Sequence, residues 1–226
     1  MNFYDFCKFV IQHIGKPPDA KRYSGEISLD STIWSEIKNL AKFTSQFNYE
    51  HSITLFIVDK DIIATPPVKG SKSDVHTQHQ VNLKYKPKNK NFYEKQILLN
   101  GKLVKKSYVR ITDIPRDSQI ISLFNIHSHP STISDGIRHY NFFSSTDLNT
   151  LFSSQSLCIG LVTDKFFLAC RHSQSPRYLS EEQRQILDQI NFDFYNAGKL
   201  QNELLEKLAL VFYEGEFSKK LQRLNK

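Results

Sequence analysis

The spacing of apolar residues divides the chain into helical and extended segments. Residues 1–15 and 31–46 carry apolar side chains at helical spacing. The Gly15–Pro18 stretch predicts the end of the first helix, because glycine and proline interrupt helical backbone. Ser31 or Thr32 is expected to cap the second helix at its amino end. The chain therefore begins with two predicted helices.

Short apolar runs bounded by turn residues predict strands in the middle of the chain. The Asn100-Gly101 pair between two apolar runs is a strong signal for a β-hairpin. The other expected strands are 51–58 with a return over 59–65, a long buried strand over 119–129, and two strands about the Thr163–Lys165 turn.

Three more helices are expected in the second half of the chain. Ser144 or Ser145 can cap a helix over the following residues, and Ser180 to Gln183 has the pattern of a capping box. A last helix is predicted from about residue 200 to the end, with an apolar stripe of Leu204, Leu205, Leu208 and Phe212. This order of helices and strands predicts an α/β (α+β) layer fold.

Composition narrows the class of protein. Hydrophobic residues make up 39% and aromatic residues 12% of the 226 positions, which predicts a packed core and argues against a disordered chain. The three cysteines form no CxxC pair, which argues against a disulfide framework and a Cys-rich zinc knuckle. No signal-peptide pattern and no apolar run of membrane-spanning length is seen, so a cytoplasmic location is expected.

The chain is basic, with a formal net charge of +7 and an isoelectric point near 9.2. Such a balance suits nucleic acid, an anionic membrane or an acidic protein, but it equally serves solubility. Charge alone therefore does not choose a partner.

Candidate chemistry is concentrated at the end of the 119–129 strand. Residues two apart on a strand point to the same side, so His127 and His129 are expected to project together, with Ser128 opposite. Pro130 ends strand pairing directly afterwards. A catalytic zinc site commonly takes three protein ligands and keeps a position for water. Asp147, in the first turn of the helix that follows, is the candidate third ligand.

The motif His127-x-His129-Pro130 followed by Ser144-x-x-Asp147 resembles that of the JAMM (JAB/MPN+) zinc metalloprotease family. The resemblance implies that His127, His129 and Asp147 bind Zn²⁺ and that Ser144 stabilises the oxyanion on the attacked carbonyl. The family also has a glutamate before an early strand, which matches Glu50 here, while Glu26, Glu36 and Glu94 lie at no helix-to-strand junction. Glu50 is therefore the expected general base.

The same resemblance implies a three-layer, cytidine-deaminase-like sheet flanked by helices, with extra helices at both ends. We expect an N-terminal helical extension over 1–30, the metalloprotease domain over 31–178, and a C-terminal helical segment over 179–226 that packs on the domain or mediates oligomerisation.

The function implied by the resemblance is hydrolysis of the peptide or isopeptide bond after the C-terminus of ubiquitin or a ubiquitin-like protein. Neither a membrane nor nucleic acid is expected as a partner on this reading. The alternative is a RadC-like or scaffold protein that binds nucleic acid or a protein partner without proteolysis.

Two long segments depart from the family pattern. The loop over 131–143 separates the histidines from Ser144 and is a candidate lid or specificity element, and the lysine-rich section over 66–106 is a candidate docking surface. His76 and His79 are expected in a solvated loop, and His139 is a weaker ligand candidate than Asp147, which has the motif spacing.

Overall fold

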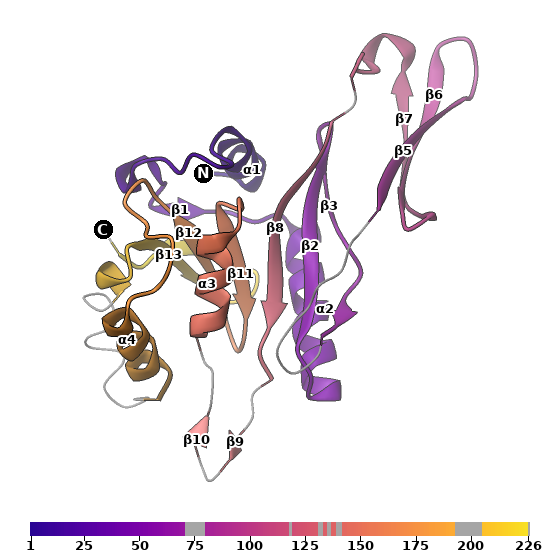
Figure 1. Cartoon of the computed structure of the whole chain (residues 1–226). Coiled ribbons are helices and arrows are strands. Elements are labelled where there is room, and N and C mark those ends of the chain that lie inside the picture. Colours follow the sequence, from indigo (N-terminus) through magenta and orange to yellow (C-terminus); the bar gives the residue numbers. More distant parts are fainter. Residues whose placement is uncertain are drawn as a thin grey trace.

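A computed structural model of the chain describes residues 1–70, 80–117, 119–130, 133–134, 137–138, 142–192 and 205–225 (Figure 1). The described chain is a mixed α/β structure, which confirms the predicted class at this level. Its α-helices are α1 (Phe3–Gln12), α2 (Ser31–Phe47), α3 (Ser145–Ser153) and α4 (Glu181–Phe192), with short 3₁₀ turns at Ala20–Arg22 and Ile111–Asp113.

The strands form a large central sheet and two small ones. The central sheet has the order β1-β14-β13-β12-β11-β8-β2-β3, with β4 pairing to β2. Its strands are β1 (Glu26–Ile27), β2 (His51–Val58), β3 (Asp61–Ala64), β4 (Val68–Lys69), β8 (Ile120–Ser128), β11 (Cys158–Val162), β12 (Phe166–Arg171), β13 (Leu210–Gly215) and β14 (Leu221–Arg223).

One pair of strands in the central sheet is parallel. β8 and β11 run in the same direction, and α3 connects them, whereas β2 and the other paired strands of this sheet are antiparallel to their neighbours. The helix of such a β-α-β unit starts near the carboxyl end of its first strand. The carboxyl end of β8 therefore lies beside the start of α3 and the start of β2.

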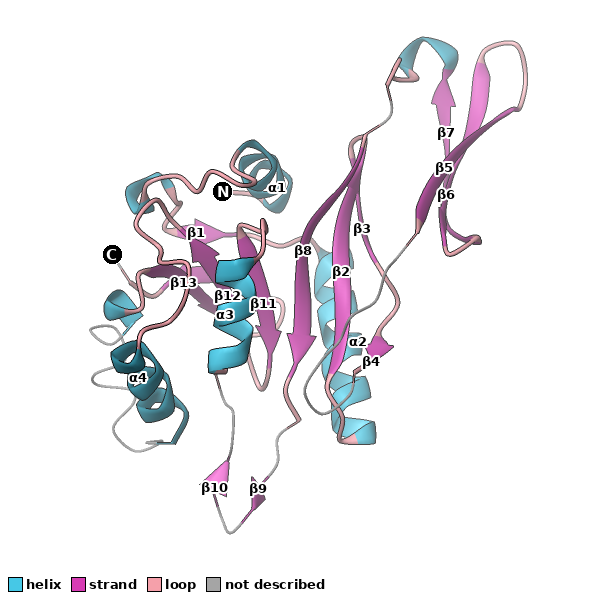
Figure 2. Cartoon of the chain, viewed as in Figure 1, coloured by secondary structure: helices cyan, strands magenta, loops and turns pink. Residues whose placement is uncertain are grey.

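Helices cover both faces of the central sheet (Figure 2). On one face, Phe6 of α1 and Trp34 and Ile37 of α2 pack with inward residues of the strands. On the other face, helices α3 and α4 contribute Leu148 and Leu187 to a second cluster. Successive residues of β12 alternate between the two clusters, as expected for a strand buried on both sides.

A separate three-stranded sheet, β5 (Val81–Pro87), β6 (Phe92–Leu99) and β7 (Lys102–Arg110), projects from the end of the molecule opposite the carboxyl end of β8 (Figure 1). The Asn100-Gly101 turn between β6 and β7 confirms the predicted hairpin. Both turn residues have positive φ, 48° and 79°, which Asn and Gly tolerate best.

The predicted helix from about residue 200 to the end is confirmed for residues 205–207 and is wrong beyond them. Residues 210–215 and 221–223 are β13 and β14, so Leu208 and Phe212 are not on one helical stripe. β13 pairs with β12 along six residues, and this long-range pairing overrides the local helical spacing. The predicted break at Ala197-Gly198 and Leu204 lie outside the described residues.

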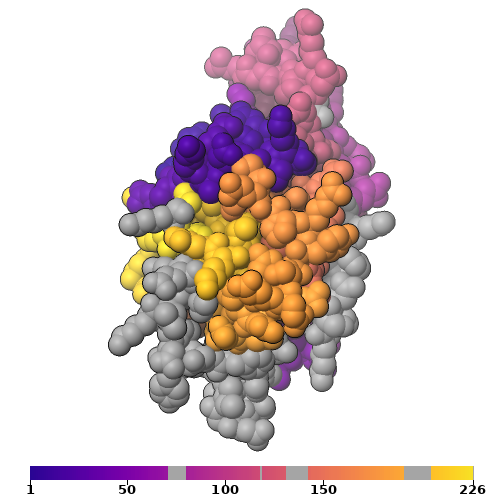
Figure 3. All heavy atoms as spheres, turned by 60° about the vertical axis from the view of Figure 1, so that its left-hand side comes forward, coloured from indigo at the N-terminus to yellow at the C-terminus, as the bar shows by residue number. Residues whose placement is uncertain are grey.

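The two terminal segments are joined in the central sheet. β1 pairs with β14, and the indigo N-terminal and yellow C-terminal residues adjoin on one face in Figure 3. The segments 1–30 and 179–226 therefore both contribute strands to the sheet instead of adding helices alone. Their separation from 31–178 as domains stays a prediction.

Within the part of the chain that the structure describes, no helix is both long and apolar enough to span a membrane. The 131–143 segment contains two short paired strands, β9 (Ile133–Ser134) and β10 (Ile137–Arg138), beyond the carboxyl end of β8 (Figure 1). Its suggested lid role stays a prediction, and Asp135, His139 and Tyr140 lie outside the described residues.

Candidate metal centre

The two histidines lie at the carboxyl end of β8. Both are largely buried, and their ring centroids are 5.0 Å apart. Ser128, between them, points to the other face, where its hydroxyl contacts the backbone of His51 and the hydroxyl of Thr44. The backbone N–H of His129 donates to Val162 on β11, so the strand pairing continues up to Pro130. The predicted shared orientation of the histidines is therefore confirmed.

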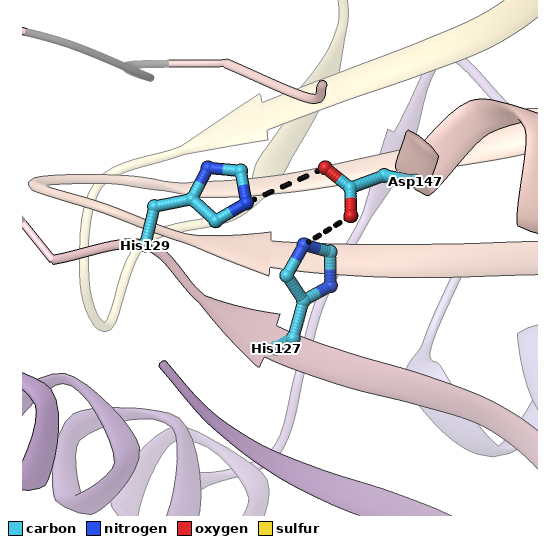
Figure 4. A group of neighbouring side chains, drawn as sticks. All are labelled: His127, His129 and Asp147. Carbon is cyan, nitrogen blue, oxygen red and sulfur yellow. Dashed lines mark ion pairs between the residues drawn. The ribbon is translucent and has the colours of Figure 1, made fainter. Parts of the chain in front are cut away.

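Helix α3 brings Asp147 to the same place. Ser144 is its N-cap: the Ser144 hydroxyl accepts from the Asp147 N–H, and the Asp147 carboxylate accepts from the Ser144 N–H. This capping box holds Asp147 in the first turn. Because the β-α-β connection starts α3 beside the end of β8, Asp147 faces the two histidines (Figure 4).

The ligand atoms of the three side chains converge on one point. Nε2 of His127 lies 3.1 Å from Oδ1 of Asp147, and Nε2 of His129 lies 3.4 Å from Oδ2. One ligand atom from each residue lies within 4.8 Å of the others. A tetrahedral ion with bonds of about 2.0–2.1 Å spaces its ligands by about 3.4 Å, so this set can hold a metal ion.

The buried Nε2 atom of His127 is better explained as a metal ligand than as a partner in a hydrogen bond within the protein. Although it lies 3.1 Å from Oδ1 of Asp147, it makes no hydrogen bond to any of the described residues. A buried nitrogen that makes no hydrogen bond lowers the stability of the folded state. A cation between the three side chains would satisfy it.

The Gly160 carbonyl on β11 orients the His127 ring. It accepts a hydrogen bond from the ring, and since Nε2 has no such partner, Nδ1 is the donor. That leaves the Nε2 lone pair directed at the site in the neutral tautomer. Burial lowers the pKa of His127, but the Asp147 carboxylate and this carbonyl more than offset burial, so the pKa lies above its ordinary value.

Asp147 is held ionised by its neighbours. Burial alone would raise the pKa of its carboxyl, but His127 and His129 outweigh this effect and hold the pKa well below its ordinary value. The Ser144 hydroxyl also donates to Oδ2 at 2.8 Å. The centre thus offers one anionic oxygen ligand and two imidazoles, a donor set typical of Zn²⁺ and other transition metals.

Glu50 lies at the edge of the same centre. Helix α2 ends at Phe47, its C-cap Asn48 has the left-handed conformation, and the chain then enters β2 at His51. Because β2 is antiparallel to β8, its start lies beside the end of β8. Oε1 of Glu50 is 3.9 Å from Nε2 of His129. Burial, with a contribution from Asp147, raises the pKa of Glu50 against the opposing effect of the histidines.

The alternative glutamates lie in other elements. Glu26 is in β1, Glu36 in α2 and Glu94 in β6, where Lys106 pairs with it at 2.7 Å. Among the residues that the structure describes, Glu50 is the carboxylate that lies against a histidine of the centre, apart from Asp147. Its predicted position between helix and strand is confirmed, while its role as a base stays a prediction.

A polar group behind the histidines was not identified from the sequence. Thr44 on α2 contacts both the Ser128 hydroxyl and Nδ1 of His51, and His51 also bonds the Tyr49 carbonyl at 2.9 Å. These contacts tie α2, β2 and β8 together just behind the ligands. The sequence signal was available, since Ser128 alternates with two histidines on a buried strand and needs a polar partner there.

Comparison of the chain with protein-family models, with curated proteins and with solved structures gives no match in any of the three. His76 and His79, the other histidine pair in the sequence, lie outside the described residues.

Proposed function

We propose that the centre binds Zn²⁺ and that the chain is a JAMM-type metallopeptidase. The observation that carries this proposal is the convergence of Glu50 with His127, His129 and Asp147 at one end of β8, from three separate elements. A scaffold has no need for a carboxylate of raised pKa beside a metal-binding triad. Bound zinc would supply a Lewis acid that polarises a carbonyl and acidifies water.

The residues of the chain then have distinct tasks. Glu50, whose pKa is raised by burial, takes a proton from a water molecule at this edge and delivers it to the leaving amine. The Ser144 hydroxyl now donates to Asp147, so stabilising an oxyanion requires that hydroxyl to turn from Oδ2 toward the substrate. His127, His129 and Asp147 hold the cation.

The proposed substrate is a peptide or isopeptide bond after the C-terminus of ubiquitin or a ubiquitin-like protein. This substrate class follows from the motif resemblance, and the geometry of the centre is compatible with it. If the bond is an isopeptide, the amine that receives the proton from Glu50 is a lysine side chain.

The test measures both the metal content and the cleavage activity of each variant. We expect about one zinc per chain by elemental analysis, and cleavage of some member of a panel of ubiquitin-like fusions and conjugates that stops when a chelator is added. Glu50→Gln should keep the metal and lose cleavage, whereas His127→Ala should lose both. Glu182→Gln, an exposed carboxylate on α4, is the matched control and should change neither.

Two results would contradict the proposal in different ways. Absence of zinc from the purified chain and failure to bind added zinc would remove the metal site. Full metal content with no chelator-sensitive cleavage across the panel would favour the scaffold alternative, in which Glu50→Gln has no effect.

A further inference from the structure

The positive charge of the chain is concentrated in the sheet of β5, β6 and β7. Residues 81–110 contain nine Lys and Arg side chains and one Glu, a net charge of +8. The whole chain carries +7, so all its other residues together sum to −1. Solubility does not require such segregation, whereas recognition of a polyanion does.

The inner face of this sheet is already occupied. Ile97 packs in a cluster with residues of β2 and β3. Nζ of Lys95 lies 3.0 Å from Asp59 and 2.9 Å from Asp61, and Nζ of Lys105 lies 2.8 Å from Asp61. These contacts attach the sheet to the body of the molecule and neutralise the inward cations, which leaves the outer face to solvent.

The outer face is a grid of cations and aromatic rings. Side chains alternate along a strand, so every second residue belongs to it, except at the bulge of β7 opposite Ile97 and Leu98. The cross-strand register sets Lys84 beside Gln96 and Lys106, Lys86 beside Glu94 and Tyr108, and Phe92 beside Arg110. Tyr108 is 55% exposed and Phe92 36%, and Lys88 and Lys90 continue the charge into the turn after β5.

Several of these cations have no internal counter-charge. Glu94 is shared by Lys106 and Lys86. Lys84 and Arg110 form no ion pair with any residue in the described part of the chain, and both are exposed. Lysine on open edge strands also discourages sheet-to-sheet pairing, but that role does not call for exposed aromatic rings beside the cations.

We propose that this outer face, over β5, β6 and β7, binds single-stranded nucleic acid. Lysine and arginine would neutralise phosphates, and Tyr108 and Phe92 would stack on unpaired bases. A protein partner fits less well, because lysine is depleted in protein–protein interfaces. A membrane also fits less well, because the exposed apolar residues of β7 are not gathered in one place: Leu103 and Val104 lie at its start and Ile111 lies just beyond its other end.

The site is separate from the metal centre. The sheet projects from the end of the molecule opposite the carboxyl end of β8 (Figure 1). Nucleic acid on its outer face would leave Glu50 and the histidines open, so this inference does not rest on the proposed peptidase function. His127→Ala is expected to leave nucleic-acid binding unchanged.

The experiment measures fluorescence anisotropy of labelled 20-nucleotide single-stranded DNA and RNA with the whole chain, at 50 and 200 mM salt. We expect micromolar affinity at low salt, a steep loss at high salt, and weaker binding of a duplex of equal length. Lys84→Glu with Arg110→Glu should weaken single-strand binding at least tenfold. Lys38→Glu with Lys42→Glu, exposed on α2 and of equal charge change, is the control and should have a much smaller effect.

A second variant separates stacking from charge. Tyr108→Ala should weaken single-strand binding about tenfold while leaving heparin binding unchanged, because heparin has no bases to stack. The proposal is overturned if no oligonucleotide binds at 50 mM salt, or if the α2 variant weakens binding as much as the sheet variant. It is also overturned if anionic vesicles or polyglutamate bind as tightly as the oligonucleotides.

Discussion

Ser144 shows how one hydroxyl can serve both a helix and a metal ligand. It accepts from the Asp147 N–H at 3.2 Å and donates to Oδ2 of Asp147 at 2.8 Å. We predict that Ser144→Ala lowers the free energy of unfolding by about 1 kcal/mol, the usual cost of a lost N-cap. Because the carboxylate also loses its orienting partner, metal affinity should fall about 10- to 100-fold.

Urea denaturation and competition with a chelator measure these two effects. Ser145→Ala, one position further into the helix, is the control, and Ser144→Thr should restore both properties because threonine keeps the hydroxyl. An unchanged metal affinity in Ser144→Ala would show that Asp147 needs no support from the cap.

His172 is a residue that the fold keeps in its neutral form. It is buried, and its Nδ1 accepts from the Gln174 N–H at 3.2 Å, which only an unprotonated nitrogen can do. Burial, aided by the Arg223 charge, lowers the pKa of His172. Its contribution to stability is therefore full above the unfolded-state pKa near 6.5 and is lost as the pH falls through the lower folded-state value.

We predict that the free energy of unfolding falls between about pH 7 and pH 5 and that His172→Asn reduces this fall. Asparagine offers an acceptor oxygen near the position of Nδ1 but does not titrate. Urea denaturation of both proteins at the two pH values gives the comparison. Equal pH dependence in the two proteins would show that His172 does not cause the loss of stability at low pH.

At the scale of elements, the parallel pair of β8 and β11 depends on a glycine. A Cβ on Gly160 would lie 2.8 Å from Cγ1 of Ile126 and 3.0 Å from the Phe166 ring. We predict that Gly160→Ala costs about 1–3 kcal/mol through overpacking. Since Ile126 precedes His127, metal affinity should fall as well.

Gly25→Ala is the matched control, because a Cβ there meets nothing within 4 Å. Thermal denaturation compares the two variants, and about 1 kcal/mol corresponds to about 2–4 °C in a domain of this size. A Gly160→Ala protein as stable as Gly25→Ala would mean that the two strands separate easily.

The same scale shows what sequence patterns can and cannot predict. The helix and strands around the site carry strong local signals, such as the Ser144 cap and the apolar run of β8, and these were predicted correctly. The N-cap of α2 is Asp30 instead of Ser31 or Thr32, since a cap can move by a residue within a polar run. The C-terminal strands were not predicted, because their pairing partners lie far away in sequence.

Strand β5 was not predicted, although its signal was present. Val81, Leu83 and Tyr85 alternate with Lys84 and Lys86, and this period of two marks a strand with one covered face. The lysines were interpreted only as a charged section. On the covered face, the Tyr85 hydroxyl donates to Asp59 in the β2–β3 turn, and no local pattern of residues 81–87 contains this distant partner.

At the scale of the whole molecule, Lys95 holds the three-stranded sheet to the central one. It is 5% exposed, and its Nζ lies between Asp59 and Asp61 and near the Val58 carbonyl. Burial lowers the pKa of Lys95, but the two aspartates outweigh it and raise the pKa, so the amine stays charged. Removal of this cation would leave two carboxylates facing each other.

We predict that Lys95→Met lowers stability by about 3 kcal/mol, at the lower end for a broken buried pair because Lys105 still neutralises Asp61. The loss should be local: hydrogen exchange should accelerate in β5–β7 while β11 and β12 stay protected. Lys106→Met, which removes an outer-face cation, should leave exchange in β5–β7 nearly unchanged. If β11 and β12 lost protection equally, the two sheets would form one cooperative unit, and any ligand on the outer face would then also stabilise the metal centre.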